Sequence, residues 1–186
     1  MVSLASLWLP ILLSAVIVFV ASSIVHMVLP WHRKDVMKLP HEEEVVAALL
    51  KAGVGRGEYS FPCPESMAAM RSPAMIEKFK RGPVGSMILR ASGPPALGKS
   101  LVQWFLYCVA VGILAAYVGG ITLAPGTEYR PVFRVVSTVA FLGYAAALWQ
   151  GPIWKGSPWG TTLRHTIDGL LYGLLTGGTF GWLWPH

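Results

Sequence analysis

Four long apolar stretches dominate the pattern of hydrophobic and polar positions along the chain. They run from Leu4 to Leu29, Val102 to Leu123, Val132 to Trp149 and Thr161 to Leu183. A helix needs about 20 apolar residues to cross the hydrocarbon core of a bilayer, and each stretch approaches that length. Arg134 shortens the apolar run of the third stretch, and His165 and Asp168 shorten that of the fourth. We expect an all-α membrane protein with four transmembrane helices in a compact bundle.

The polar segment between the first two stretches carries signals of two helices. Pro40 to Ala52 begins with acidic residues, continues with apolar ones and is followed by Gly53. This order predicts a helix, because acids favour its first turn and glycine its end. Ser72 and Pro73 predict the start of a second helix, which Gly82 would end.

Two short runs in the same segment, Glu58 to Phe61 and Ser86 to Arg90, predict strands that pair with each other. The segment between spans one and two is therefore expected to be a small cytoplasmic α+β unit. This divides the chain into a first transmembrane helix (1–30), a cytoplasmic segment (31–100) and a three-helix transmembrane region (101–186).

Composition supports lipid as the solvent of most of the chain. Of 186 residues, 54% are apolar and only 13% are charged, far from the averages of soluble proteins. The first stretch differs from a secretory signal because no Lys or Arg precedes it and its apolar run is long. We expect it to be an uncleaved anchor.

The distribution of Lys and Arg predicts the orientation, because loops rich in these residues stay in the cytoplasm. Only Arg130 and Arg134 lie on one side of the expected membrane. The other side holds Arg33, Lys34, Lys38, Arg90, Lys99, Lys155 and Arg164. We expect a multi-pass protein of the bacterial inner membrane with both termini outside the cytoplasm.

The net charge of +6 arises mainly in the cytoplasmic segment, where eleven Lys or Arg face seven Asp or Glu between Trp31 and Ser100. An anionic inner leaflet is the expected partner of this basic surface. Nucleic acid is not expected, since acids interleave the basic residues and no aromatic platform or recognition motif accompanies them.

The run GPPALGKS, Gly93 to Ser100, matches the phosphate-binding pattern G-x-x-x-x-G-K-[ST]. A working loop of that kind needs a buried strand before it and a soluble helix after it. Here an apolar stretch follows, and Pro94 and Pro95 remove two backbone N–H donors. We expect no nucleotide binding.

Small residues recur every four positions in the apolar stretches. Helices in lipid associate where such residues let their backbones approach closely. This pattern predicts helix packing at Gly112, Ala116, Gly120, Gly169, Gly173, Gly177 and Gly181.

Ionisable groups near the cytoplasmic ends of the stretches are the only candidates for chemistry, because such groups are costly in a membrane. His26, Cys108, His165 and Asp168 fall at comparable depth, and their side chains are ligands that zinc or haem iron accepts. In the alternative, Asp168 pairs with His165, His26 or Arg164 and clasps the helices together. We expect the clasp and no cofactor, with zinc or haem as the alternative.

The runs HMVLPWHRKD, GPPALGKSLVQWFLY and HTIDGLLYGLLTGGTFGWLWPH, with the four-stretch layout, resemble an uncharacterised group of bacterial four-span inner-membrane proteins. The resemblance implies the fold and the location and brings no activity, cofactor or catalytic residue.

Three functions remain open on the sequence. The first is an accessory or assembly subunit that packs against another membrane protein or against a second copy of itself, which the glycine faces and the missing catalytic set favour. The second is a metal- or haem-binding membrane protein. The third is a small transporter. An enzyme is the less expected class, and no catalytic residue is predicted.

Overall fold

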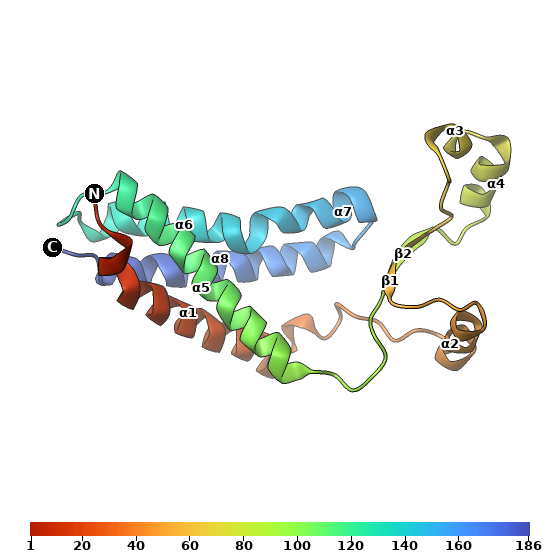
Figure 1. The fold of residues 1–186 in the computed structure, drawn as a ribbon, viewed down its shortest axis with the longest axis horizontal. Helices are drawn as coiled ribbons and strands as arrows, with labels where there is room; N and C mark the ends of the chain where they lie inside the picture. Colours follow the sequence, from red (N-terminus) through yellow and green to blue (C-terminus); the bar gives the residue numbers. More distant parts are fainter. The chain divides into compact units, whose positions relative to one another are not determined.

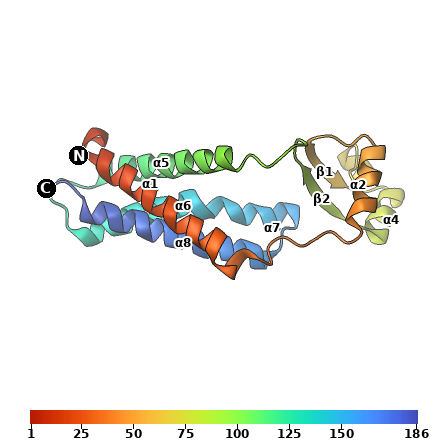
Figure 2. The same cartoon turned by 90° about the horizontal axis from the view of Figure 1, so that it is seen from below.

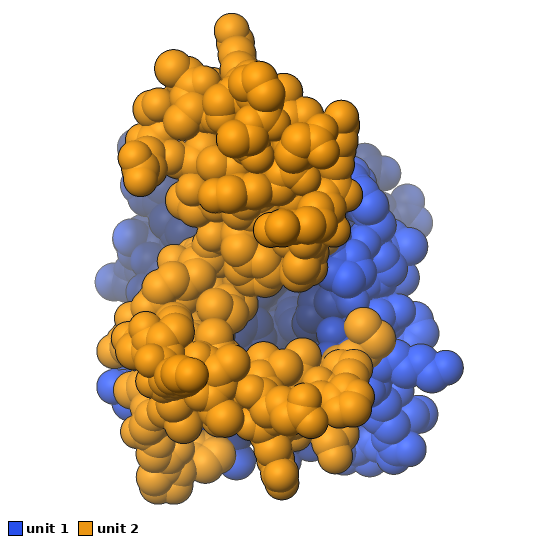
Figure 3. All heavy atoms as spheres, turned by 90° about the vertical axis from the view of Figure 1, so that its right-hand side faces the viewer, with its two compact units in different colours: residues 1–36, 96–153, 157–186 blue, residues 37–95, 154–156 orange.

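The computed structural model describes residues 1–186, which are mostly helical with one two-stranded sheet. The chain divides into two compact units, coloured separately in Figure 3. The helical unit comprises residues 1–36, 96–153 and 157–186, and the small unit comprises residues 37–95 and 154–156.

Five α-helices build the helical unit, with α7 running on to Lys155. Helices α6 and α8 lie side by side, α1 packs on both α5 and α8, and α5 also packs on α6 (Figures 1 and 2). The bounds are α1 Trp8–Ser23, α5 Leu97–Thr122, α6 Tyr129–Ala145, α7 Gln150–Lys155 and α8 Trp159–Trp182.

Three helical segments are long and apolar enough to cross a membrane: Leu4–Val28, Leu97–Thr122 and Tyr129–Lys155. The sequence predicted four. Helix α8 is long enough, but Arg164, Asp168 and its many Gly and Thr residues make it less apolar than the other three. The structure therefore supports a membrane protein with three candidate spans, and the fourth span stays a prediction.

Helix bounds also differ from the apolar stretches that predicted them. Helix α5 begins at Leu97 and not at Val102, because Lys99 and Ser100 are exposed and can stay polar within the first turns. Helix α6 ends at Ala145, where a 3-10 turn over Ala146–Trp149 leads into α7. A hydropathy pattern therefore does not predict where a helix with polar end residues begins.

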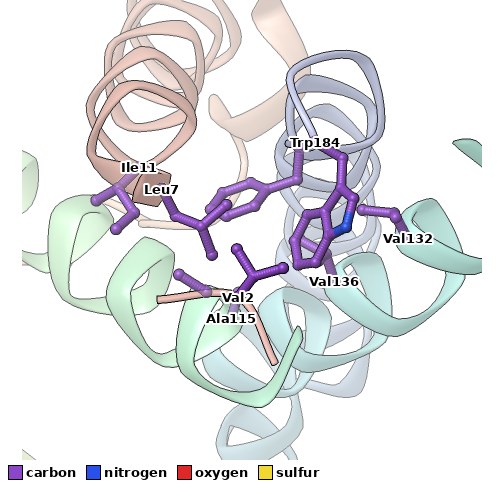
Figure 4. Close-up of a cluster of buried hydrophobic side chains, with 9 residues drawn as sticks. Val2, Leu7, Ile11, Ala115, Val132, Val136 and Trp184 are labelled. Carbon is purple, nitrogen blue, oxygen red and sulfur yellow. The ribbon is translucent and has the colours of Figure 1, made fainter. Parts of the chain in front are cut away.

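The end of the helical unit that holds both chain termini is filled by apolar side chains (Figure 4). Val2, Leu7, Phe180 and Trp184 belong to one buried cluster there. The Val2 N–H donates to the Gly120 carbonyl at 2.9 Å. The Trp184 indole N–H donates to the Ala124 carbonyl at 3.0 Å. The two termini are thereby tied to the same end of α5. We call this region the terminal end.

Glycines let α8 approach α6 closely. A Cβ atom built on Gly173 would lie 3.1 Å from the Ser137 carbonyl oxygen, and one on Gly177 would lie 2.8 Å from the Phe133 carbonyl oxygen. Gly169 and Gly181 likewise face α6 residues. On α5, Gly112 and Gly120 face Ile11 and Val2, and Ala116 is fully buried. Both stripes therefore pack within this chain.

The small unit holds the short elements predicted for the cytoplasmic segment. The predicted helix start at Ser72 is confirmed, since the Met75 N–H donates to the Ser72 side chain at 3.2 Å. The predicted strand pair is also confirmed and is antiparallel, with Tyr59 opposite Met87. The short helix α3 was not predicted. The bounds are α2 Glu42–Lys51, β1 Gly57–Phe61, α3 Met67–Met70, α4 Pro73–Arg81 and β2 Gly85–Leu89.

Candidate metal centre

Two short turns after α1 bring two histidines together. Helix α1 continues into a π-helical turn, Ile24–Val28, which carries His26. Pro30 then starts a 3-10 turn that ends at His32, since proline cannot continue the helical hydrogen bonding. The His26 and His32 rings stack with their centroids 4.3 Å apart. Single π-helical turns occur frequently at functional sites.

Helix α8 supplies two more polar groups from one face, because His165 and Asp168 are three residues apart. The His165 ring stacks on His32 with centroids 4.7 Å apart. Asp168 Oδ2 lies 2.8 Å from His32 Nε2 and 3.7 Å from His165 Nδ1. The predicted pairing of Asp168 with His165 is confirmed, but its closest partner is His32.

Four side chains thus form what we call the histidine cluster: His26, His32, His165 and Asp168. One ligand atom from each lies within 4.8 Å of all the others. Atoms that share one Zn²⁺ at 2.0–2.1 Å are at most about 4.2 Å apart. Side-chain rotations would therefore be needed to bring all four onto one ion.

Neighbouring groups orient two of the imidazoles. His26 Nδ1 lies 3.1 Å from the Ser22 carbonyl oxygen, and His32 Nδ1 lies 2.5 Å from Asp35 Oδ2. Metal-binding histidines commonly donate their second ring N–H to a carbonyl or a carboxylate in this way. The arrangement leaves Nε2 of both rings available to a metal ion.

Asp35 is itself held by Arg164, whose Nε donates to Asp35 Oδ1 at 2.8 Å. Burial alone would raise the pKa of Asp35. The hydrogen bonds and positive charges of Arg164 and His32 outweigh burial and lower this pKa to about 2. Asp35 is therefore an anion at neutral pH, suited to hold the His32 ring in one orientation.

Two buried atoms at the centre of the cluster lack hydrogen bonds. His32 Nε2 and Asp168 Oδ2 are as close as an ion pair, and Asp168 Oδ2 also lies near His165 Nδ1, yet neither atom makes a hydrogen bond. Asp168 is only 5% exposed. A buried polar atom without a partner costs about 1–3 kcal/mol. A cation between the two atoms would satisfy both.

A cavity of about 400 Å³ adjoins the histidine cluster. His26, His165 and Asp168 form part of its wall. Most of the remaining wall is apolar or aromatic and comes from α1, α5, α6 and α8, including Met27, Leu97, Leu101, Trp104, Tyr144, Leu148 and Tyr172. Three of the four cluster side chains are therefore accessible from this cavity.

The structure brings together three of the four residues singled out in the sequence. Cys108 is not among the cluster residues and is buried in an apolar cluster with Val111 and Tyr144. Arg164 pairs with Asp35 and not with Asp168. His32 and Asp35 were not predicted, because they follow Pro30 in the polar segment outside the apolar stretches. The available signal was a second histidine shortly after a helix-ending proline.

The glycine-rich run matching a phosphate loop spans the start of α5. Gly93 has a positive φ of 135° and belongs to the turn, whereas α5 begins at Leu97 and includes Lys99 and Ser100. The helix after the run is thus one of the three candidate spans. The prediction that no nucleotide binds is not tested by this arrangement.

Comparisons with protein-family models, with curated proteins and with solved structures found no match for this chain. No activity or ligand is therefore transferred from a relative. The chemistry of the histidine cluster and its cavity is the basis for assigning a function.

Proposed function

We propose that this chain is a metal-binding integral membrane protein whose His26, His32, His165 and Asp168 hold one divalent transition-metal ion. The observation that carries the proposal is the convergence of four ligand atoms within 4.8 Å, drawn from both ends of the sequence. His32 Nε2 and Asp168 Oδ2, which are buried and make no hydrogen bond, support it, because a cation would satisfy both atoms. His32 adds a fourth ligand, and we therefore favour a metal site over an ion pair that only joins the helices.

The donor set favours a bare ion over haem iron. Three imidazoles and one carboxylate can complete the four-coordinate shell of Zn²⁺. The His26, His32 and His165 rings stack with centroids 4.3 and 4.7 Å apart for successive pairs. This spacing leaves no room for a macrocycle between them. We therefore propose that the site binds zinc, and zinc is the first ion to test.

The proposed membrane arrangement has α8 as a fourth span, with both termini outside and the histidine cluster near the cytoplasmic face of the inner membrane. Support comes from the Lys and Arg asymmetry of the loops and from the packing of α8 along α6. Reporter fusions at His186 and near Gly55 test it. Cytoplasmic reporter activity at His186 would contradict the arrangement.

Zinc titration of the purified full-length chain in detergent, after chelator treatment, tests the metal site. We expect one Zn²⁺ per chain. His32→Ala should lower the affinity by more than about a hundredfold, since loss of an outer-shell partner alone already costs ten- to a hundredfold. Asp35→Asn, which keeps all four ligands, should lower it by about ten- to a hundredfold.

The chain offers a matched control in His41, which is 78% exposed and lies outside the cluster. His41→Ala should leave the zinc affinity unchanged. Absence of zinc binding by the wild-type chain, or an equal loss in His41→Ala and His32→Ala, would refute the proposed site.

An accessory or assembly role stays a second prediction, because a metal site can serve a subunit of a larger complex. The glycine stripes that suggested it pack within the chain, so a partner would have to use other surfaces. Co-purification from native membranes tests this role, and recovery of the chain without any companion would count against it. The small-transporter hypothesis gains no specific support from the helical unit.

A further inference from the structure

We propose that the cavity beside the histidine cluster binds a hydrocarbon chain with a monoanionic oxygen head group, such as a fatty acid, and that the head group contacts the bound metal ion. This inference rests on the proposed metal site. It goes beyond the metal site because it names a second ligand, bound in the cavity, that the four metal-binding residues alone do not imply.

The cavity wall suits a ligand with a single polar end. Ser22 and Ser23 are already engaged, since both hydroxyls donate to the Phe19 carbonyl. The remaining polar residues of the wall are those of the histidine cluster, Tyr144 and Tyr172. The rest of the wall is mainly Leu, Met and aromatic side chains. A volume of about 400 Å³ lies in the range of small-molecule pockets, about 300–1,000 Å³.

Tyr172 supplies independent evidence for a polar ligand atom. It lines the cavity and is only 4% exposed, yet its hydroxyl has no hydrogen-bond partner. It follows Asp168 by four residues, which places both on one face of α8. A hydroxyl that is buried without a partner is costly unless a ligand satisfies it. A side-chain shift that turned the phenol toward the cavity would let it donate to an oxygen anion held near the ion.

The net charge of the metal-loaded site favours an anionic ligand. With a divalent ion bound, the metal and Arg164 outweigh the carboxylates of Asp35 and Asp168 by one positive charge. A monoanionic head group would neutralise this excess, whereas a cationic one would add to it. A carboxylate oxygen is also a ligand that zinc accepts, and zinc can expand to five-coordination.

The surrounding helices indicate where such a ligand comes from. Three sides of the cavity are provided by α1, α5 and α6, which belong to the three candidate spans. A chain-bearing anion dissolved in the bilayer therefore has a path to the cavity that does not require transfer through water. We commit to the lipid phase as its source.

Calorimetric titration of the full-length chain with decanoate, in a neutral detergent, tests the inference. Zinc-loaded protein should bind decanoate at least about tenfold more tightly than chelator-treated protein, corresponding to the head-group contact. Decanol, with the same chain and no charge, should bind at least about tenfold more weakly than decanoate. Equal binding with and without zinc, or equal binding of the alcohol, would overturn the inference.

Two variants separate the cavity from the metal site. Leu101→Trp on α5 should fill the cavity and abolish decanoate binding, with zinc still bound at one per chain. Its control is Leu106→Trp on the same helix, at a residue that is 59% exposed and outside the cavity wall. Tyr172→Phe, which keeps the packing, should weaken decanoate by about three- to tenfold, the range expected for one hydrogen bond.

The outcomes for the two proposals are distinct. If the wild type binds zinc but no decanoate, the ligand inference fails and the metal site stands. If it binds neither, both fail. If Leu101→Trp binds decanoate as tightly as Leu106→Trp, the anion binds elsewhere and the inference fails.

Discussion

The two ends of the helical unit differ in how they are packed and in whether their buried polar atoms make hydrogen bonds. At the terminal end, Leu7 and Phe180 are fully buried among apolar neighbours, and the indole of Trp184 has its hydrogen bond. At the other end, a cavity adjoins buried polar atoms of His32, Asp168 and Tyr172 that make no hydrogen bond. The terminal end is filled with apolar side chains, whereas the other end, which we call the cluster end, combines a mostly apolar cavity with a few buried polar atoms.

This difference indicates that one end of the helical unit stabilises the fold and the other end binds ligands. Filled apolar packing stabilises a fold, and unsatisfied buried polar groups reduce its stability unless something binds to them. Sites that break local rules without internal compensation are where function is expected. The terminal end should therefore set the stability of the chain without metal, and the cluster end should respond to ligands.

The largest expected effect is at Phe180. Phe180→Ala should leave a cavity in the terminal end and reduce the free energy of unfolding by about 3–5 kcal/mol. Thermal melting in detergent measures it, with Leu174→Ala as the control because Leu174 is 41% exposed on the same helix. Zinc should stabilise the Phe180 variant as much as the wild type. A similar loss in both variants would show that α8 is not anchored through Phe180.

The next effect separates two adjacent glycines of α8. Gly177→Ala would place a Cβ 2.8 Å from the Phe133 carbonyl oxygen, whereas Gly178→Ala would meet only the Tyr129 hydroxyl at 3.6 Å. Overpacking should destabilise the first variant by about 1–3 kcal/mol. The second should be neutral or slightly stabilising, because alanine favours helix. Melting temperatures that fall equally would mean that α8 does not need this close approach to α6.

A pH titration sharpens the comparison at the cluster end. Because the folded protein lowers the pKa of Asp35 to about 2, the unfolded chain takes up this proton first, near pH 4. Asp35 should contribute about 2 kcal/mol above pH 4, and this stability should disappear as the pH falls toward 2. Melting of the metal-free protein across this range measures it. Asp35→Asn should flatten the profile, and an unchanged profile would contradict the ion pair.

The smallest expected effect concerns two neighbouring serines of α1. The Trp104 indole N–H donates to Ser22 Oγ at 2.8 Å, which joins α5 to α1. Ser23 Oγ bonds only within its own helix. Ser22→Ala should cost about 0.6 kcal/mol, the mean for hydrogen bonds between membrane helices, and Ser23→Ala should cost less. Chemical unfolding in mixed micelles measures the free energy of unfolding of both variants. A larger loss in Ser23→Ala than in Ser22→Ala would show that the Trp104–Ser22 hydrogen bond does not stabilise the cluster end.

Local signals made parts of this fold predictable from sequence. The Ser72 cap and the paired strands were found because a few adjacent residues determine them. The three most apolar helices were found through hydropathy. For α8, hydropathy is insufficient because glycine, threonine and the cluster residues dilute it.

Three of the four residues of the histidine cluster were predicted, and the fourth, His32, was missed for a physical reason. His165 and Asp168 share a helix face, so their spacing alone places them together. His32 reaches them through the π-helical turn after α1 and the 3-10 turn that starts at Pro30, and no hydrophobic periodicity predicts either turn. Cys108 was grouped with the cluster by depth, but depth does not specify which way a helix turns its side chains.

The origin of the cluster in the first and last helices has a consequence for biosynthesis. His26 and His32 leave the ribosome before α5 and α6, whereas His165 and Asp168 leave it after them. Helices emerge in order from the N-terminus, so the four ligands cannot meet until α8 has been synthesised and docked. A chain truncated before α8 would lack half of the set, and metal capture would mark a chain in which α8 is docked.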